Sequence, residues 1–242
     1  MTQNIYDDPE FFAGYRRLPR SVHGLAGAPE WPSLRRLLPE LRGRAVLDLG
    51  CGFGWFCRWA HEAGAQRVLG VDVSEKMLAE ARVRTADAAI TYRRADLETL
   101  ELPEACFDLA YSSLVLHYIE DLTGLLARVR RALRPGASLV FSAEHPIVTA
   151  PRQPRWTRGA DGRKTWSIDG YGNEGRRVRD WLAKGVLKQH RTLATYLNLL
   201  VRLGFTIVHV EEWSPSDAQI AADPSLAEER ERPMFLLVAA RA

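Results

Sequence analysis

The chain has 242 residues, of which 46% are hydrophobic and 26% are charged. A chain of this length buries roughly 70–75% of the surface that it exposes when unfolded, which excludes disorder as its main state. The formal net charge is only +3, and the 3 cysteines form no CxxC pair, which fits reduced thiols in a cytoplasm. The acidic N-terminus predicts neither a signal peptide nor a transit peptide, and no apolar run is long enough to predict a membrane span.

Residues 1–43 predict an N-terminal arm or lid with one short helix, a loop and a second helix near Ser33–Leu41. From Arg44 onward, short apolar runs alternate with amphipathic stretches, and this alternation predicts a parallel sheet with helices on both faces, over a core of residues 44–145. The predicted strands are Ala45–Leu49, Arg67–Val71, Ile90–Arg93, Phe107–Tyr111 and Ser138–Ser142, and the predicted helices are Trp55–Ala63, Glu75–Thr85 and Leu122–Leu133.

Residues 146–191 lose this pattern and predict a long insertion that caps a binding pocket. This segment contains eleven Lys and Arg residues but only four Asp and Glu residues, so the rest of the chain is net acidic. Its aromatic residues, interleaved with arginines, favour a planar or anionic small molecule. Residues 192–242 then predict a helix and two strands that complete the core; these elements are Thr192–Leu203, Thr206–Glu211 and Phe235–Ala240.

The most informative segment is the end of the first core strand, where Asp48 is followed by Gly50, Gly52 and Gly54. Glycines allow a tight turn and a close approach of the backbone to a ligand, but a dinucleotide fingerprint has the spacing G-x-G-x-x-G, and here it is G-x-G-x-G. The Asp48 carboxylate would repel a pyrophosphate and accept hydrogen bonds from an ammonium group. The loop therefore predicts a ligand that carries an amino acid.

Two further acids follow at the ends of the next strands. Asp72 stands 24 positions after Asp48, where a carboxylate can accept both hydroxyls of a ribose. Asp96 ends the third strand, where it can accept the exocyclic amine of an adenine. The three acids in this order predict a cradle for a nucleoside that bears an amino acid.

These motifs, VLDLGCGFG, GVDVSEKML, RRADLETL, FDLAYSSLVLHYIED and LRPGASLVFS, resemble those of class I S-adenosylmethionine-dependent methyltransferases. The similarity is to the small bacterial type related to ubiquinone and menaquinone biosynthesis methyltransferases, with a methyltransferase type 11 domain, and it covers at least residues 44–145. It implies a Rossmann-like doubly wound sheet of seven mostly parallel strands, with an antiparallel last strand at Met234–Ala240. It also implies S-adenosyl-L-methionine as cofactor and S-adenosyl-L-homocysteine as product.

The resemblance assigns cofactor-binding roles to residues of these motifs. Gly50 and Gly52 would line the methionine moiety, with Cys51 as a small residue between them. The N-terminal segment departs slightly from the family's Y-D-x-x-A-x-x-Y pattern and offers Tyr15 and Arg20 for the carboxylate end. The other positions implied by the motifs are Asp72 at the ribose, Val73 and Met77 at the adenine rim, Asp96 and Leu97 at the adenine edge, and Ser112 beside the sulfonium.

Three histidines are candidates for a catalytic base, because ligands of doubly wound sheets gather at the carboxyl ends of the strands. His145 directly follows the fifth strand, His117 follows the fourth, and His190 precedes the helix after the insertion. Packing within the protein is the alternative role for each of them. No metal site is predicted.

Three functions remain open at this point. The first is methyl transfer to a small molecule at an oxygen, nitrogen or carbon nucleophile. The second is methylation of RNA such as tRNA, favoured by the basic insertion although no RNA-binding module adjoins the fold. The third is non-catalytic binding of the cofactor; a dehydrogenase is disfavoured by the glycine spacing and by Asp48. A monomer and a homodimer are both compatible with the sequence.

Overall fold

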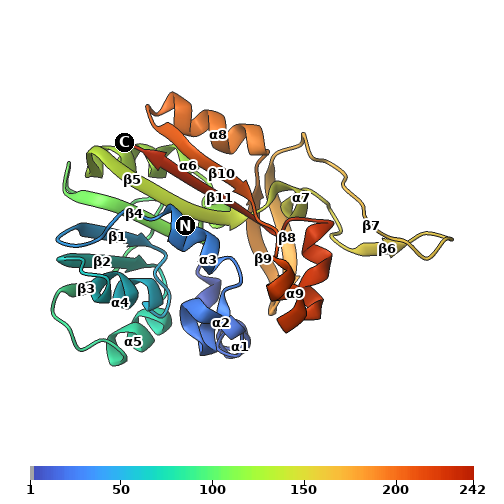
Figure 1. The fold of residues 1–242 in the computed structure, drawn as a ribbon, viewed down its shortest axis with the longest axis horizontal. Helices are drawn as coiled ribbons and strands as arrows, with labels where there is room; N and C mark the ends of the chain where they lie inside the picture. The colour runs from blue at the N-terminus through green and yellow to red at the C-terminus, as the bar shows by residue number, and fades with distance from the viewer. Residues whose placement is uncertain (1–2) are drawn as a thin grey trace.

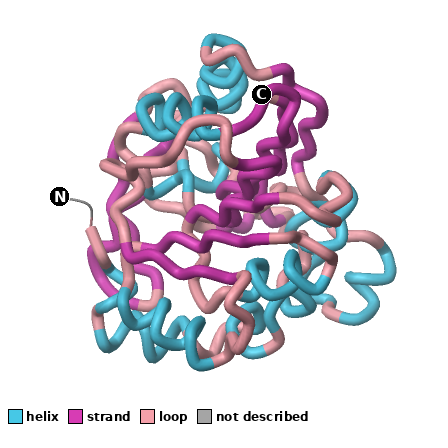
Figure 2. Tube along the Cα trace, turned by 90° about the vertical axis from the view of Figure 1, so that its left-hand side faces the viewer, coloured by secondary structure: helices cyan, strands magenta, loops and turns pink. Residues whose placement is uncertain are grey.

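The computed structural model describes residues 3–242 and places a twisted seven-stranded sheet between two layers of helices (Figures 1 and 2). The strand order is β10-β11-β5-β4-β1-β2-β3, and β11 runs antiparallel to both neighbours while β1 to β5 pair in parallel. This order confirms the predicted fold class. The strands are β1 Ala45–Leu49, β2 Arg67–Asp72, β3 Ile90–Arg94, β4 Phe107–Ser113, β5 Leu133–Glu144, β10 Thr206–Glu212 and β11 Phe235–Arg241.

Amphipathic helices cover both faces of the sheet. On one face, α3 (Trp31–Leu37), α4 (Trp55–Glu62) and α5 (Glu75–Val83) bury Leu34, Phe56 and Leu78. On the other, α6 (Leu122–Ala132) and α8 (Leu193–Arg202) bury Leu125 and Leu199. Each helix buries a stripe at helical spacing, because apolar residues three or four positions apart lie on one face. The two cores fix the sheet, and with it the carboxyl ends of β1, β2, β4 and β5.

The N-terminal region contains more helices than predicted. They are η1 Ile5–Asp7, α1 Pro9–Tyr15, α2 Pro19–Val22 and η2 Gly24–Gly27, before α3. The helix predicted near Ser33–Leu41 therefore begins earlier and ends earlier, at Leu37. Pro9, Pro19 and Pro32 each lie in the first turn of a helix, where the missing N–H costs nothing and the fixed φ favours helix.

The insertion is more regular than its sequence pattern indicates. After α7 (Pro146–Thr149), it forms two antiparallel hairpins, β6 Trp156–Arg158 with β7 Lys164–Trp166, and β8 Gly175–Trp181 with β9 Ala183–His190. The β6–β7 hairpin extends away from the body, whereas β8 and β9 lie against the end of the sheet (Figure 1). The β8–β9 turn lacks the usual glycine or asparagine, and Leu182 adopts a φ of +59° instead.

Two more helices, α9 (Asp217–Ala222) and the 3-10 helix η4 (Pro224–Arg230), separate β10 from β11 and were not predicted. Their sequence signal is the capping box of Ser216 and Gln219, in which each side chain bonds the other residue's backbone. No helix within residues 3–242 is long and apolar enough to cross a membrane.

Candidate functional site

The loop between β1 and α4 turns sharply at its glycines. Gly50 has a φ of +76°, and a Cβ there would lie 2.2 Å from the Val115 side chain. Gly52 has a φ of +51°, and its N–H donates to Asp72 Oδ2 at 2.9 Å. Only glycine combines this backbone conformation with so close a neighbour. The loop is thus held across the ends of β1 and β2.

Asp72 ends β2 and accepts two backbone hydrogen bonds. Its Oδ2 accepts from Gly52 and its Oδ1 from Ser74, both at 2.9 Å. Burial raises the pKa of this carboxyl above its ordinary value, although these hydrogen bonds oppose the shift. The structure therefore places Asp72, the residue predicted to bind a ribose, next to the glycine loop.

Asp48 lies beneath the same loop and is almost fully buried. The Cys57 thiol donates to its Oδ2 at 3.2 Å. Burial raises the pKa of Asp48 to about 7; the thiol hydrogen bond opposes this shift and the Asp72 charge adds to it. Burial also raises the pKa of the Cys51 thiol to about 11, so Cys51 is an uncharged wall of the loop.

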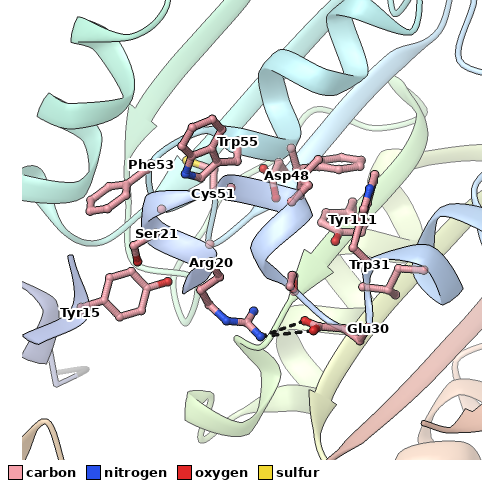
Figure 3. A pocket seen from close by; sticks show the side chains of 18 residues that line it. Tyr15, Arg20, Ser21, Glu30, Trp31, Asp48, Cys51, Phe53, Trp55 and Tyr111 are labelled. Atoms are coloured by element: carbon pink, nitrogen blue, oxygen red, sulfur yellow. Dashed lines mark hydrogen bonds and ion pairs between the residues drawn. The ribbon is translucent and has the colours of Figure 1, made fainter. Parts of the chain in front are cut away.

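A cavity of about 100 Å³ opens between this loop and the N-terminal helices (Figure 3). Trp55 Nε1 is a buried N–H that finds no partner within residues 3–242, and Trp55 lines this cavity. A buried unpaired donor is costly, so its position next to a cavity favours a polar ligand there. The predicted residues that line the cavity are Tyr15, Arg20, Asp48, Gly50, Cys51 and Gly52; lining residues that the sequence did not reveal include Ser21, Glu30, Trp31, Trp55, Tyr111 and Ser113.

Arg20 and Glu30 form an ion pair at the rim of this cavity. Arg20 NH2 lies 3.1 Å and 3.3 Å from the two oxygens of Glu30, which is fully buried (Figure 3). Burial of the guanidinium opposes its charge, but the adjacent Glu30 outweighs this and raises the pKa of Arg20. Sequence reasoning identified Arg20 and missed its partner, since an isolated Glu in a loop carries no signal.

The other predicted cofactor residues lie around the same sheet edge. Met77 and Leu97 are buried, and the Val73 carbonyl accepts from Arg94 at 3.2 Å. Asp96 lines a separate depression of about 370 Å³ together with Gln3 and Tyr118.

Ser112 does not line the cavity. It is fully buried, and its hydroxyl donates to the Leu49 carbonyl at 3.0 Å, tying β4 to β1. Side chains alternate along a strand, so its neighbour Ser113 faces the cavity instead.

The N-terminal segment spans from α5 to the insertion. Asp7 accepts hydrogen bonds from Ser74 Oγ at 2.5 Å and from the Lys76 N–H at 3.1 Å. Gln3 pairs with the backbone of β9, donating to Gly185 O at 2.9 Å and accepting from the Leu187 N–H at 2.8 Å. The segment therefore crosses the carboxyl end of the sheet and covers it.

His145 does not point toward the cavity. Its Nδ1 accepts from the Ile147 N–H at 3.2 Å and its Nε2 lies 2.8 Å from Glu212 Oε1 on β10. Burial lowers its pKa, against the effect of Glu212. Both ring nitrogens are thus occupied, which argues against the predicted role as a base.

His190 and His117 are also held by the protein. His190 bonds Thr149 Oγ1 at 2.9 Å and the Tyr171 carbonyl at 2.8 Å, so it fastens the insertion to α7. His117 Nδ1 accepts from the Glu144 N–H at 3.2 Å, and burial lowers its pKa to about 4. Neither histidine has a basic nitrogen open to the cavity, although His117 lies beside a charged group that sequence reasoning missed.

That group is Glu144, the last residue of β5, which forms a salt bridge with Lys188 of β9. Lys188 is buried, with its ammonium 5.1 Å from the Trp181 ring centroid and 5.8 Å from that of Tyr118. His117 Nε2 lies 4.0 Å from Glu144 Oε1. No motif marks this pair, because its members come from segments 44 residues apart.

The predicted aromatic and basic wall is only partly present. Arg177, Arg179 and Arg191 donate to backbone carbonyls within the protein. Trp156 and Trp166 pack against each other and against Arg232, away from the cavity. Trp181 does reach the N-terminal segment, where its ring centroid lies 5.4 Å from that of Phe11. Within residues 3–242, no cluster of His, Cys, Asp and Glu is arranged to hold a metal ion.

The fold and the glycine loop define a Rossmann-like protein that binds a nucleotide-type cofactor. Residues 47–141 match the model of a family described as "Methyltransferase domain". A solved structure of an S-adenosylmethionine-dependent methyltransferase from Mesorhizobium loti is 62% identical, covers 90% of this chain and all of its own, and superposes with a TM-score of 0.88. An uncharacterized protein of Haemophilus influenzae is 36% identical over 217 residues, 86% of this chain and 85% of its own length.

Two curated enzymes match over shorter stretches. A malonyl-[acyl-carrier protein] O-methyltransferase of Pectobacterium atrosepticum is 38% identical over 45% of this chain and 42% of its own length. A tRNA U34 carboxymethyltransferase of Pseudoalteromonas translucida is 36% identical over 52% of this chain and 42% of its own length. The chain belongs to the S-adenosylmethionine-dependent methyltransferases, and S-adenosylmethionine is its cofactor.

The site residues fit the chemistry of this cofactor. It carries an ammonium, a carboxylate and a ribose, and the cavity offers the acid Asp48, the cation Arg20 and the unpaired N–H of Trp55, with Asp72 beside the loop. When bound, the cofactor supplies a methyl group on a positively charged sulfur.

Proposed function

We propose that this methyltransferase acts on a small-molecule acceptor that binds under the N-terminal segment and the β8–β9 hairpin. The observation that carries this proposal is the bridge between Gln3 and the backbone of β9, which covers the carboxyl end of the sheet. An acceptor that approaches the cofactor at this end of the sheet would lie beneath this cover. A small molecule fits such a site more readily than a folded macromolecule.

The residues around the site would contribute mainly by positioning and by excluding water. Holding donor and acceptor in line can supply on the order of 7–11 kcal/mol of the barrier. Transfer of a methyl group from a sulfonium to a neutral nucleophile disperses charge, so a dry site favours it. Tyr6, Phe11 and Tyr15 form edge-on ring contacts with one another or with Phe53 over the glycine loop, and would provide that dry cover.

Methylation of RNA is the second candidate, favoured by the short match to a tRNA-modifying enzyme. The basic insertion supports it less than its composition indicates. Arg177, Arg179 and Arg191 are engaged with carbonyls, and Lys164 and Lys188 form salt bridges with Glu228 and Glu144. Cations paired within the protein release few counterions from a phosphate backbone.

The test is to incubate the protein with S-adenosylmethionine labelled in its methyl group and a bacterial cell extract separated into small molecules, RNA and protein. We expect label in the small-molecule fraction. Label in RNA alone would contradict this proposal and indicate an RNA methyltransferase. Binding of S-adenosylhomocysteine without any labelled product would indicate a non-catalytic protein.

A further inference from the structure

At the end of β5, Glu144 lies two residues beyond Ser142, on the face of the sheet that borders the cavity at the glycine loop, although Glu144 does not itself line that cavity. Ser113 lines the cavity, and its hydroxyl lies 3.2 Å from that of Ser142 on the adjacent strand. Because side chains alternate along a strand, Glu144 follows Ser142 on the same face. His145 is turned to β10 instead, where it contacts Glu212.

A second path of contacts joins Glu144 to the cavity from above. Tyr15, which lines the cavity, contacts the ring of Tyr6 at a centroid distance of 5.2 Å. Tyr6 Oη lies 3.4 Å from Tyr118 Oη, and Tyr118 lies under the ammonium of Lys188. Two short paths therefore lead from Glu144 to residues that line the cavity, one along β5 and Ser142 to Ser113 and one through Lys188, Tyr118 and Tyr6 to Tyr15.

Only one of the two carboxylate oxygens of Glu144 has a partner in the described part of the protein. Its Oε1 binds Lys188, whereas Oε2 has no partner in the part of the chain that the structure describes. The side chain keeps 20% of its surface accessible, while that of Lys188 keeps 7%. A buried ion pair gains little stability, since desolvation offsets the attraction of its charges. A partly accessible ion pair that leaves one carboxylate oxygen free, two residues along β5 from the cavity side of the sheet, is better explained by a role in the reaction than by a gain in stability.

We propose that Glu144 is the proton acceptor of the reaction and that the acceptor nucleophile is a hydroxyl group, with Lys188 as a positioning residue. This inference rests on the proposed function. The hydroxyl oxygen forms a bond to the methyl carbon as the carbon–sulfur bond breaks, and that electron pair stays on sulfur. The hydroxyl proton passes to Glu144 Oε2. One sulfonium and one carboxylate become a neutral thioether and a neutral carboxylic acid, which a site of low dielectric constant favours.

The charges around Glu144 fit a hydroxyl better than an amine. Burial alone would raise the pKa of Glu144, but its charged neighbours hold the pKa below its ordinary value, so the group is ionised at neutral pH. Such a weak base cannot deprotonate an ammonium group, but it can take the proton of a hydroxyl as that oxygen becomes methylated and strongly acidic. The titratable groups that face Glu144 are His117 and Tyr118 of η3 (Leu116–Tyr118), Arg179 of β8, Lys188 of β9 and Tyr196 of α8.

The experiment uses ¹³C-methyl-labelled S-adenosylmethionine and the small-molecule filtrate of a bacterial extract as the acceptor source. NMR of the product made by the wild-type protein identifies the methylated atom, and we expect oxygen. Single-turnover transfer is then measured from pH 5 to pH 9 for wild type, Glu144→Gln and Lys188→Met. Glu144→Gln should lose roughly 10²–10⁴-fold in rate. Calorimetry with S-adenosylhomocysteine should give unchanged cofactor affinity.

The Lys188→Met variant tests the inference independently of whether the Glu144→Gln variant folds correctly. Removing the ammonium should raise the pKa of Glu144 and move the acid limb of the pH–rate profile to higher pH, with the plateau rate retained. The matched control is the exposed Glu104→Gln, which should leave rate and profile unchanged.

A methyl group found on nitrogen or carbon, a Glu144→Gln rate within about threefold of wild type, or an unmoved acid limb in Lys188→Met would each overturn this inference alone. A wild-type protein that labels no small molecule overturns the proposed function, and this inference with it.

Discussion

Asp48 lies in an environment unlike that of an ordinary, solvated carboxylate. It is buried against Cys57 and has a pKa raised to about 7, so it is about half protonated near neutral pH. The unfolded chain ionises this group near pH 4, so the folded state loses stability as pH rises from that value through 7. A ligand that carries an ammonium group removes this penalty by pairing with the ionised form.

Cofactor binding should therefore be linked to release of a proton from Asp48. We expect the affinity for S-adenosylhomocysteine to increase as the pH is raised toward 7, by up to about tenfold per pH unit, and to level off above pH 7. Calorimetry at pH 6 and pH 8, in buffers of different ionisation enthalpy, measures the proton released. Asp48→Asn should abolish this pH dependence, weaken binding at pH 8 and raise the Tm of the free protein. An affinity of wild type that is flat over this range would contradict the link.

At the scale of single elements, α5 has two N-terminal caps from distant parts of the chain. Ser74 accepts from the Met77 N–H at 3.1 Å, and Asp7 accepts from Ser74 Oγ and from the Lys76 N–H. Residues 3–15 and the N-terminus of α5, the helix that follows Asp72, thus stabilise each other. A cap of this kind is worth about 1 kcal/mol.

Asp7→Ala should cost about this much stability and should also weaken S-adenosylhomocysteine binding, because it releases Tyr6 and Tyr15 from above the glycine loop. Thermal unfolding and calorimetry measure the two effects. The control is Glu10→Gln, an exposed residue of α1 on the same segment. If Asp7→Ala lowers Tm while affinity stays at the wild-type value, the cap is structural only.

Elements with a strong local signal were predictable, and elements formed by distant contacts were not. The bounds of β1 and the start of α5 agree with the sequence prediction, because an apolar run before glycines and a serine cap are local features. The β8–β9 hairpin escaped prediction because its turn uses Leu182 at a positive φ. The turn of the glycine loop and its contact with Asp72 follow from local motifs, whereas the ion pairs of Glu30, Glu144 and Lys188 form only when the sheet and the insertion bring their partners close.

At the scale of the whole molecule, the N-terminal segment and the β8–β9 hairpin form one cover over the sheet. Gln3 bonds the backbone of β9, and Phe11 contacts Trp181. Tyr15 of the same segment lines the cavity at the glycine loop, although no residue of β9 does. Ligand contacts at the cavity should therefore stabilise the hairpin through the segment.

We expect S-adenosylhomocysteine to slow amide hydrogen exchange in residues 175–190 as well as in residues 5–15, because a ligand that binds the closed form shifts the population toward it. Trp181→Ala should keep the protection of the segment and lose that of the hairpin, since it removes the contact with Phe11. Val178→Ala, an exposed position on the same hairpin, is the matched control. If amide exchange in the hairpin of the wild-type protein is the same with and without S-adenosylhomocysteine, the hairpin and the N-terminal segment move independently. The acceptor would then enter past a hairpin that does not respond to the cofactor.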